Sequence, residues 1–236
     1  MRPPEHNNLI AEPFRDDSVT PAVVGFLHRP ASATWDGLVL THGAGSNANA
    51  PLLVALAETF SAQGTIVLRC NLPYRQTRSY GPPGPGDAAR DREGLRNAVG
   101  ALRGLAGGRI FLGGHSYGGR QSTMLCAEEP HLAQALLLLS YPLHPPRKPE
   151  QLRTQHFPKL GTPALFIHGT RDPFASSEEI QHALDLIPAT TRLAEIEGAG
   201  HDLGFEKKST SPELPERIAR AFREFFSEAG SPRHQP

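Results

Sequence analysis

The sequence predicts an α/β fold, in which a mostly parallel sheet lies between two layers of helices as a three-layer sandwich. Three observations lead to this prediction. Short apolar runs alternate with amphipathic stretches along the whole chain, which is the pattern of parallel strands joined by helices. The apolar run 110–112 leads into a glycine-rich turn, and a stretch that can be helical follows at 120–129. The composition does not shift along the chain, so we expect residues 1–236 to form a single domain.

The strands are predicted from apolar runs that have the length of a buried strand. The run 37–41 is almost entirely apolar, which is typical of a strand buried on both faces. The same reasoning, together with β-branched content, places strands at 19–28, 37–41, 65–68, 109–112, 135–139, 163–167 and 190–196. The longest apolar run, 135–139, is far shorter than the roughly 20 residues that cross a bilayer.

The helices are predicted from their end signals and apolar faces. Asn49 can cap a helix that has Pro51 in its first turn, and Gly64 ends this helix. Ser176 and Glu179 have the spacing of a capping box, which begins a later helix. The remaining helices are expected at 88–104, at 120–129 and from 211 onward.

Two long stretches, 70–86 and 140–162, contain too many prolines for regular structure. Connections of this length in a compact domain are often functional, so both stretches are candidates to lie over a site. The ends of the chain, 1–12 and 230–236, are polar and contain proline, and we expect them to be flexible.

Composition excludes several classes of function. The 24 Lys and Arg residues balance the 24 Asp and Glu residues, which argues against a surface for nucleic acid or for an anionic membrane. Cys70 and Cys126 are too few for a disulfide framework, and no metal-ligand spacing surrounds them. No signal peptide is visible. We expect a cytoplasmic protein with no cofactor and no metal, and its oligomeric state is left open between monomer and homodimer.

The sequence around Ser116 has the form of a nucleophile elbow, with Gly114 two residues before the serine and Gly118 two residues after it. A serine at a tight turn from strand to helix adopts a strained backbone conformation, and side chains at the two glycine positions would collide across the turn. The turn lifts the hydroxyl above the sheet, and the first N–H of the helix, that of Tyr117, points at charge that develops beside it. Ser116 is therefore the candidate nucleophile.

Acyl transfer by a serine needs a base that takes the hydroxyl proton and an acid that orients this base. His201, in a glycine-flanked loop after the last expected strand, is the candidate base. Asp172, which follows the preceding strand, is the candidate acid, and the neighbouring Asp202 is the alternative. Because these loops all follow strands of a parallel sheet, we expect Ser116, Asp172 and His201 to meet at one edge.

An oxyanion hole needs two backbone donors, and small residues allow the backbone to approach the substrate. We expect one donor from Tyr117 and the other from Ala44, with Gly45 as the second choice and as a substrate contact. Arg75, in the proline-rich stretch 70–86, is the candidate to bind an anionic group on the substrate, since a guanidinium forks onto a carboxylate or phosphate. The alternative is that Arg75 holds loops together.

The chain resembles the α/β-hydrolases from about Val19 to Phe226. Within them it is most similar to the small family, related to dienelactone hydrolases, that includes testis-expressed protein 30. The residues that carry this resemblance are Thr41-His42-Gly43-Ala44-Gly45, Leu68-Arg69-Cys70-Asn71-Leu72-Pro73-Tyr74-Arg75, Gly114-His115-Ser116-Tyr117-Gly118-Gly119-Arg120, Ser140-Tyr141-Pro142-Leu143-His144-Pro145 and Gly198-Ala199-Gly200-His201-Asp202.

The resemblance implies an α/β-hydrolase fold with about seven or eight strands, no cofactor, and a triad of Ser116, Asp172 and His201. The resemblance does not imply a substrate. The triad and the small oxyanion loop favour a serine hydrolase of carboxylic esters, thioesters or related acyl compounds, and we expect a small-molecule acyl substrate with no nucleic-acid or membrane partner. Two alternatives stay open. Some relatives serve as subunits of complexes, so the chain could be a binding or scaffold module without catalysis. A perhydrolase would use the same three residues.

Overall fold

The computed structural model describes residues 11–32, 36–205 and 213–229 of the 236-residue chain. Within this part, eight strands form one sheet in the order β1-β2-β4-β3-β5-β6-β7-β8. The strands are β1 (Glu12–Asp16), β2 (Val23–His28), β3 (Gly37–Thr41), β4 (Ile66–Cys70), β5 (Ile110–His115), β6 (Leu136–Leu139), β7 (Ala164–Gly169) and β8 (Thr191–Ile196). Strands β1 and β2 run antiparallel to their neighbours, and β3 to β8 are parallel. The predicted α/β class and mostly parallel sheet are confirmed.

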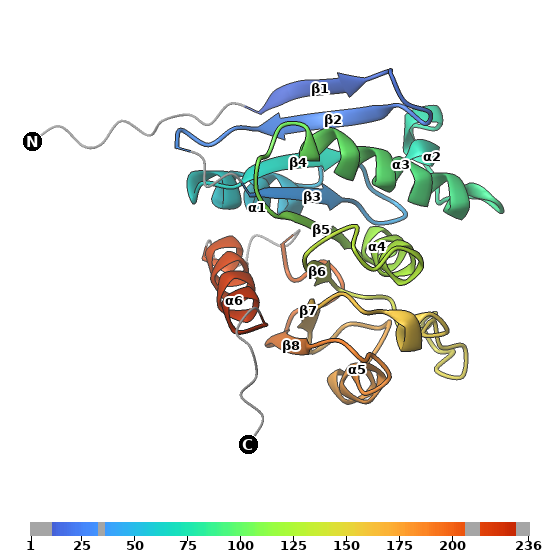
Figure 1. Ribbon diagram of the computed structural model, residues 1–236. Helices are drawn as coiled ribbons and strands as arrows, with labels where there is room; N and C mark the ends of the chain where they lie inside the picture. The colour runs from blue at the N-terminus through green and yellow to red at the C-terminus, as the bar shows by residue number, and fades with distance from the viewer. Residues whose placement is uncertain (1–10, 33–35, 206–212, 230–236) are drawn as a thin grey trace, which may run out of the picture.

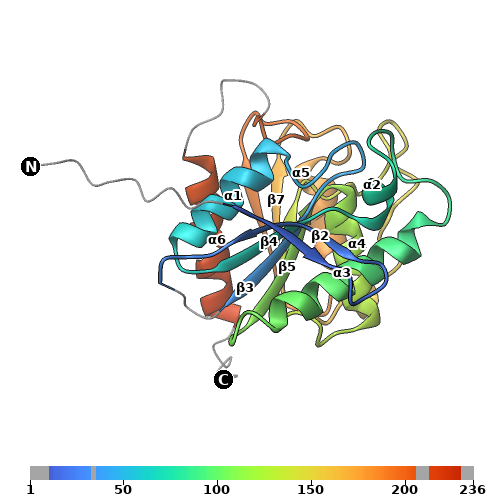
Figure 2. The ribbon, with the colours of Figure 1, turned by 90° about the horizontal axis from the view of Figure 1, so that it is seen from above.

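Helices cover both faces of the sheet, as Figures 1 and 2 show. They are α1 (Pro51–Ala62), α2 (Pro73–Thr77), α3 (Asp87–Arg103), α4 (Tyr117–Glu128), α5 (Ser177–Leu184) and α6 (Leu214–Ala229), with a short 3₁₀ helix η1 (Phe157–Lys159). Helices α1 and α6 lie on one face, and α3, α4 and α5 lie on the other. Among the described residues, no helix is both long and apolar enough to cross a membrane.

Two apolar cores hold the layers together, one on each side of the sheet. Every residue of β3, β4, β6 and β7 is buried, because these central strands have helices against both faces. This double burial explains why their sequences are mostly apolar and do not alternate; Arg69 of β4 and His168 of β7 are buried polar exceptions. The predicted capping box of α5 is also present, since Ser176 Oγ accepts a hydrogen bond from the Glu179 N–H and the Glu179 carboxylate accepts one from the Ser176 N–H.

Four sequence-based expectations differ from the structure. Strand β1 begins at Glu12, inside the end that was expected to be flexible, because its backbone pairs with β2. Helix α2 lies within the stretch 70–86, where Pro73 occupies the first turn, the one part of a helix that tolerates proline. Helix α1 has Ala50 at its N-cap, so Asn49 does not cap it. The stretch 140–162 contains η1.

Several expectations lie outside the described residues. They are the flexibility of residues 1–10 and 230–236 and the start of the last helix at 211.

Candidate active site

The turn after β5 has the geometry of a nucleophile elbow. Ser116 has φ 51° and ψ −115°, a conformation that L-residues rarely adopt. A Cβ on Gly114 would lie 2.9 Å from the carbonyl carbon of Gly118, and a Cβ on Gly118 would lie 2.6 Å from the His42 carbonyl oxygen. Both distances are too short for real side chains, so the two glycines are what allow the turn to close. The Ser116 N–H is fixed by the Leu139 carbonyl of the adjacent strand, at 2.8 Å.

A chain of hydrogen bonds connects three residues that the sequence analysis singled out. His201 Nε2 lies 2.8 Å from Ser116 Oγ, and His201 Nδ1 lies 2.8 Å from Asp172 Oδ2. The Asp172 side chain is completely buried, whereas that of His201 is 23% exposed. The loops after β5, β7 and β8 carry these residues, and they meet because parallel strands end at one edge of the sheet.

Asp202, the alternative acid, has a different role in the loop. Its Oδ1 accepts a hydrogen bond from the Gly204 N–H at 2.9 Å, which stabilises the turn after His201. It is Asp172, and not Asp202, that contacts Nδ1 of the histidine.

Two aromatic side chains that the sequence analysis missed hold His201 in place. The Phe174 ring lies against the imidazole with 4.2 Å between ring centroids, and the Phe174 N–H donates to Asp172 Oδ1 at 2.9 Å. His115 donates from Nε2 to the His201 carbonyl at 2.7 Å. Both residues are adjacent or nearly adjacent in sequence to a triad member. Their position was therefore the available signal, but sequence alone does not tell which way a loop side chain turns.

The two N–H groups expected to form the oxyanion hole belong to the elbow and to the loop after β3. In the part of the chain that the structure describes, neither the Ala44 N–H nor the Tyr117 N–H donates a hydrogen bond to another residue. Gly45 has open space where a Cβ would stand, which agrees with a backbone that faces a ligand. An apolar cavity beside this loop is lined on one side by Leu52, Leu53 and Phe205.

The Arg75 guanidinium donates hydrogen bonds to four backbone carbonyls. Nε donates to the Ser46 carbonyl at 2.7 Å, Nη2 donates to Ala44 at 3.1 Å and Gly81 at 2.7 Å, and Nη1 donates to Arg78 at 3.0 Å. The guanidinium thus joins the oxyanion loop, residues 42–46, to the loop that follows α2. These contacts favour the alternative reading of Arg75, as a residue that holds loops together, over the expected contact with an anionic substrate.

A second set of hydrogen bonds, made by Tyr74 and Asp91, fixes the oxyanion loop. The Tyr74 hydroxyl donates to the Ala44 carbonyl at 2.8 Å. Asp91, fully buried in α3, accepts from the Tyr74 N–H at 3.1 Å and from the Tyr117 hydroxyl at 2.8 Å. The Asp91 carboxylate therefore joins α2 to Tyr117, the residue that follows Ser116 in the elbow. Nothing in the sequence distinguishes Asp91 from the other charged residues of α3, so it was missed.

We expect Arg75→Ala to lower kcat on charged and neutral esters alike, by roughly 10- to 100-fold, because the oxyanion donors would shift. Arg78→Ala is the matched control, since Arg78 lies in the same loop and pairs with Asp87 near the surface. Steady-state kinetics of both variants on an anionic and a neutral ester measure the effect. A loss confined to the anionic ester, in KM alone, would instead make Arg75 a substrate contact.

Four buried or half-buried histidines are neutral in the folded protein. Burial lowers the pKa of each to about 4; they are His28, His42, His115 and His156. For His42, neutrality matches its contacts, because Nδ1 donates to the Gly43 carbonyl and Nε2 accepts from the Leu72 N–H. A neutral His42 therefore links the oxyanion loop to the segment after β4.

These pKa values make stability depend on pH. Unfolding returns each pKa to its ordinary value near 6.5, so between pH 6.5 and 4 the unfolded state binds more protons. The free energy of unfolding should therefore fall on acidification, by about 2 kcal/mol or more between pH 7 and pH 5. Urea denaturation at pH 7, 6 and 5 measures it. Stability that stays constant or rises over this range would contradict the neutral state of these histidines.

The comparisons with known proteins agree with the fold. The family model described as an alpha/beta hydrolase domain matches residues 35–227. A dienelactone hydrolase from Anabaena variabilis is 22% identical, with a TM-score of 0.70 over 92% of this chain and 98% of that one. An alpha-beta serine hydrolase homologue from Coxiella burnetii is 18% identical, with a TM-score of 0.69 over 89% and 96%. Est1E from Butyrivibrio proteoclasticus is 17% identical, with a TM-score of 0.68 over 92% and 99%. At these identities the solved structures show a shared fold.

Proposed function

The chain belongs to the alpha/beta hydrolase family, and we propose that it is a serine hydrolase of carboxylic esters, thioesters or related acyl bonds. The observation that carries this proposal is the continuous hydrogen-bond chain from Ser116 through His201 to Asp172, each link 2.8 Å long. A strained serine hydroxyl within hydrogen-bonding distance of a histidine nitrogen is the arrangement that nucleophilic catalysis requires.

In the proposed reaction, Ser116 Oγ attacks the acyl carbon while His201 Nε2 takes the hydroxyl proton. The buried Asp172 carboxylate stabilises the imidazolium that forms, and the N–H groups of Ala44 and Tyr117 stabilise the oxyanion. The imidazolium then gives its proton to the departing alcohol or thiol as the bond to the acyl carbon breaks. Water, deprotonated by His201, attacks the acyl-enzyme, and the carboxylic acid and free Ser116 are regenerated.

The substrate class is proposed at the level of the acyl bond. A structural neighbour is named as a dienelactone hydrolase, yet this similarity is one of fold, and a lactone is no better supported than an ester or thioester. The narrower similarity to the group that includes testis-expressed protein 30 rests on the sequence motifs alone. A single domain, a cytoplasmic location and a monomeric or homodimeric state likewise stay predictions.

A fluorophosphonate probe, which reacts with activated serines, tests the proposal directly. The purified protein should be labelled on one residue, identified as Ser116 by peptide mass analysis, and it should hydrolyse p-nitrophenyl butyrate. A folded protein that is neither labelled nor active would support the alternative, a binding module that has kept a hydrolase fold.

A further inference from the structure

Two arginines that the proposed reaction does not use lie next to the elbow. Arg120 is in the first turn of α4, and its N–H donates to the Ser116 carbonyl at 3.0 Å. Arg153 lies in the stretch that follows β6, with its N–H bonded to the Leu143 carbonyl at 2.8 Å. Tyr141 is close to both residues. Its hydroxyl donates to the Arg153 carbonyl at 2.8 Å, and the positive charge of Arg120 partly offsets the rise in the Tyr141 pKa that burial causes.

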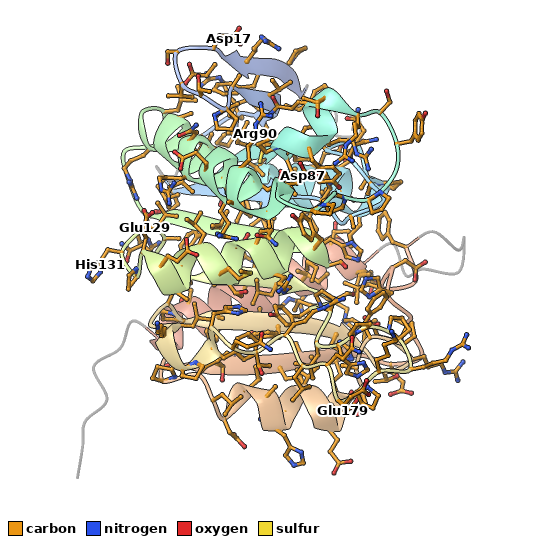
Figure 3. The ribbon with its side chains drawn as sticks, turned by 90° about the vertical axis from the view of Figure 1, so that its right-hand side faces the viewer. Asp17, Asp87, Arg90, Glu129, His131 and Glu179 are labelled. Carbon is orange, nitrogen blue, oxygen red and sulfur yellow. The ribbon has the colours of Figure 1, made fainter. Side chains whose placement is uncertain are left out.

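Arg120 lies one turn after Ser116 on α4, so its backbone is close to the elbow. Side chains in a helix tilt toward the helix N-terminus, and the N-terminus of α4 is the elbow itself. Helix α4 also packs against η1, and His156, just before η1, lies 2.8 Å from Thr123 Oγ1 on α4, so the stretch that carries Arg153 runs alongside this helix. Figure 3 faces this side of the molecule, with α3, α4 and the 140–160 stretch stacked above one another.

The charges of this pair are not balanced by acids. Within the described ranges, no carboxylate forms an ion pair with Arg120 or Arg153, although the nearby Arg92 pairs with Glu128. Nε of Arg120 is buried and has no hydrogen-bond partner among the described residues. Nη1 of Arg153 makes one long hydrogen bond, 3.3 Å to the Pro142 carbonyl. Among the described residues, Nε of Arg120 therefore has no partner, and the Arg153 guanidinium has one.

The positive charge of Arg120 lowers the pKa of two neighbouring groups. Burial lowers the pKa of Arg153, and the charge of Arg120 lowers it further, which indicates that the two guanidinium groups lie close together. His156, whose Nε2 lies 2.8 Å from Thr123 Oγ1 on α4, has a pKa lowered to about 4 by burial and then by Arg120 and Arg92. Two like charges held together under partial burial are unfavourable unless an anion lies between them.

We propose that Arg120 and Arg153 form an oxyanion-binding subsite beside Ser116, which takes a carboxylate or phosphate group carried by the acyl substrate. This assignment rests on the proposed serine-hydrolase function, and it gives the substrate a negative charge a short distance from the scissile bond. The anion-binding role that the sequence suggested for Arg75 moves to these two residues, because Arg75 donates to four backbone carbonyls and the Arg153 guanidinium donates to one.

Two chromogenic substrates test the subsite: p-nitrophenyl hemiglutarate, which carries a carboxylate, and the neutral p-nitrophenyl butyrate. The measured quantity is the ratio of kcat/KM for the anionic ester to that for the neutral ester. We expect this ratio to fall by about 10-fold or more in Arg120→Gln and in Arg153→Gln, because one bidentate charge-assisted contact is lost. Lys148→Gln is the matched control, since Lys148 is an exposed cation of the same stretch. Its ratio should stay within about 2-fold of wild type.

Inorganic phosphate, added as a competitor, separates the two kinds of anion. A fall in the ratio assigns a carboxylate. An unchanged ratio, together with phosphate inhibition that the wild type shows and both variants lose, assigns a phosphate. An unchanged ratio with unchanged phosphate inhibition, or an equal loss on both esters, overturns the subsite.

The controls keep this test independent of folding and of the proposed function. Fluorophosphonate labelling and melting temperature show whether each variant is intact. Arg153→Gln decides the question alone if Arg120→Gln does not fold, because the Arg153 guanidinium makes one protein hydrogen bond. A wild-type protein that hydrolyses neither ester and is not labelled would refute the serine-hydrolase function. A wild-type protein that hydrolyses the neutral ester, with variants that leave the ratio and the phosphate inhibition unchanged, would refute the subsite alone.

Discussion

Replacing Ser116 with alanine should reduce kcat by about 10⁴- to 10⁶-fold, the loss that follows removal of a serine nucleophile. The change removes one oxygen from the mouth of the site and leaves the buried contacts of the elbow intact, so the melting temperature should stay near that of wild type. Hydrolysis of p-nitrophenyl butyrate measures the loss of kcat, and labelling by the fluorophosphonate probe measures the loss of the reactive serine. Thermal denaturation measures the melting temperature.

His201→Ala should be about as damaging, and the double variant should be little worse than either single one, because the two residues act as a unit. Ser46→Ala offers a matched control in the nearby oxyanion loop, since the carbonyl of Ser46 and not its hydroxyl is used by Arg75. Activity in Ser116→Ala close to that of wild type would end the serine-hydrolase proposal.

Asp172→Asn should reduce kcat by about 10³- to 10⁴-fold. The asparagine fits the same space and can still accept from the Phe174 N–H through its oxygen. It cannot balance the imidazolium, and its amide N–H₂ opposes the His201 tautomer that leaves Nε2 free to accept a proton. The loss should therefore appear in kcat, with stability less affected.

Asp202→Asn is the matched control for this change, because Asp202 is the neighbouring acid and contacts the Gly204 N–H. We expect less than about a 10-fold effect, from a looser turn after His201. If Asp202→Asn were the more damaging of the two substitutions, the assignment of Asp172 as the acid would be wrong.

The parts of the site that follow strand ends could be predicted from sequence. Glycines around Ser116, a histidine after the last strand and an acid after the preceding strand are local signals, and the parallel topology brings them together without any knowledge of side-chain packing. The central strands were found for a similar reason, since burial on both faces leaves a continuous apolar run.

The missed features depend on contacts between segments far apart in the chain. Strand β1 has a polar, half-exposed sequence, and only its pairing with β2 makes it a strand. Asp91 looks like an ordinary surface charge, and the two roles open to Arg75 cannot be separated, until α3 and the loop after α2 are placed beside the oxyanion loop. Local propensity carries no information about such partners.

Residues 78–86 are held at three points, which has a consequence for divergence within the family. Arg75 donates to the carbonyls of Arg78 and Gly81, and Asp87 accepts from the Gly84 N–H. The tip between these anchors is free, and Tyr80 is 87% exposed there. Insertions and substitutions at the tip can accumulate while the chemistry is conserved, so relatives that handle different substrates should differ in length here before they differ at the anchors.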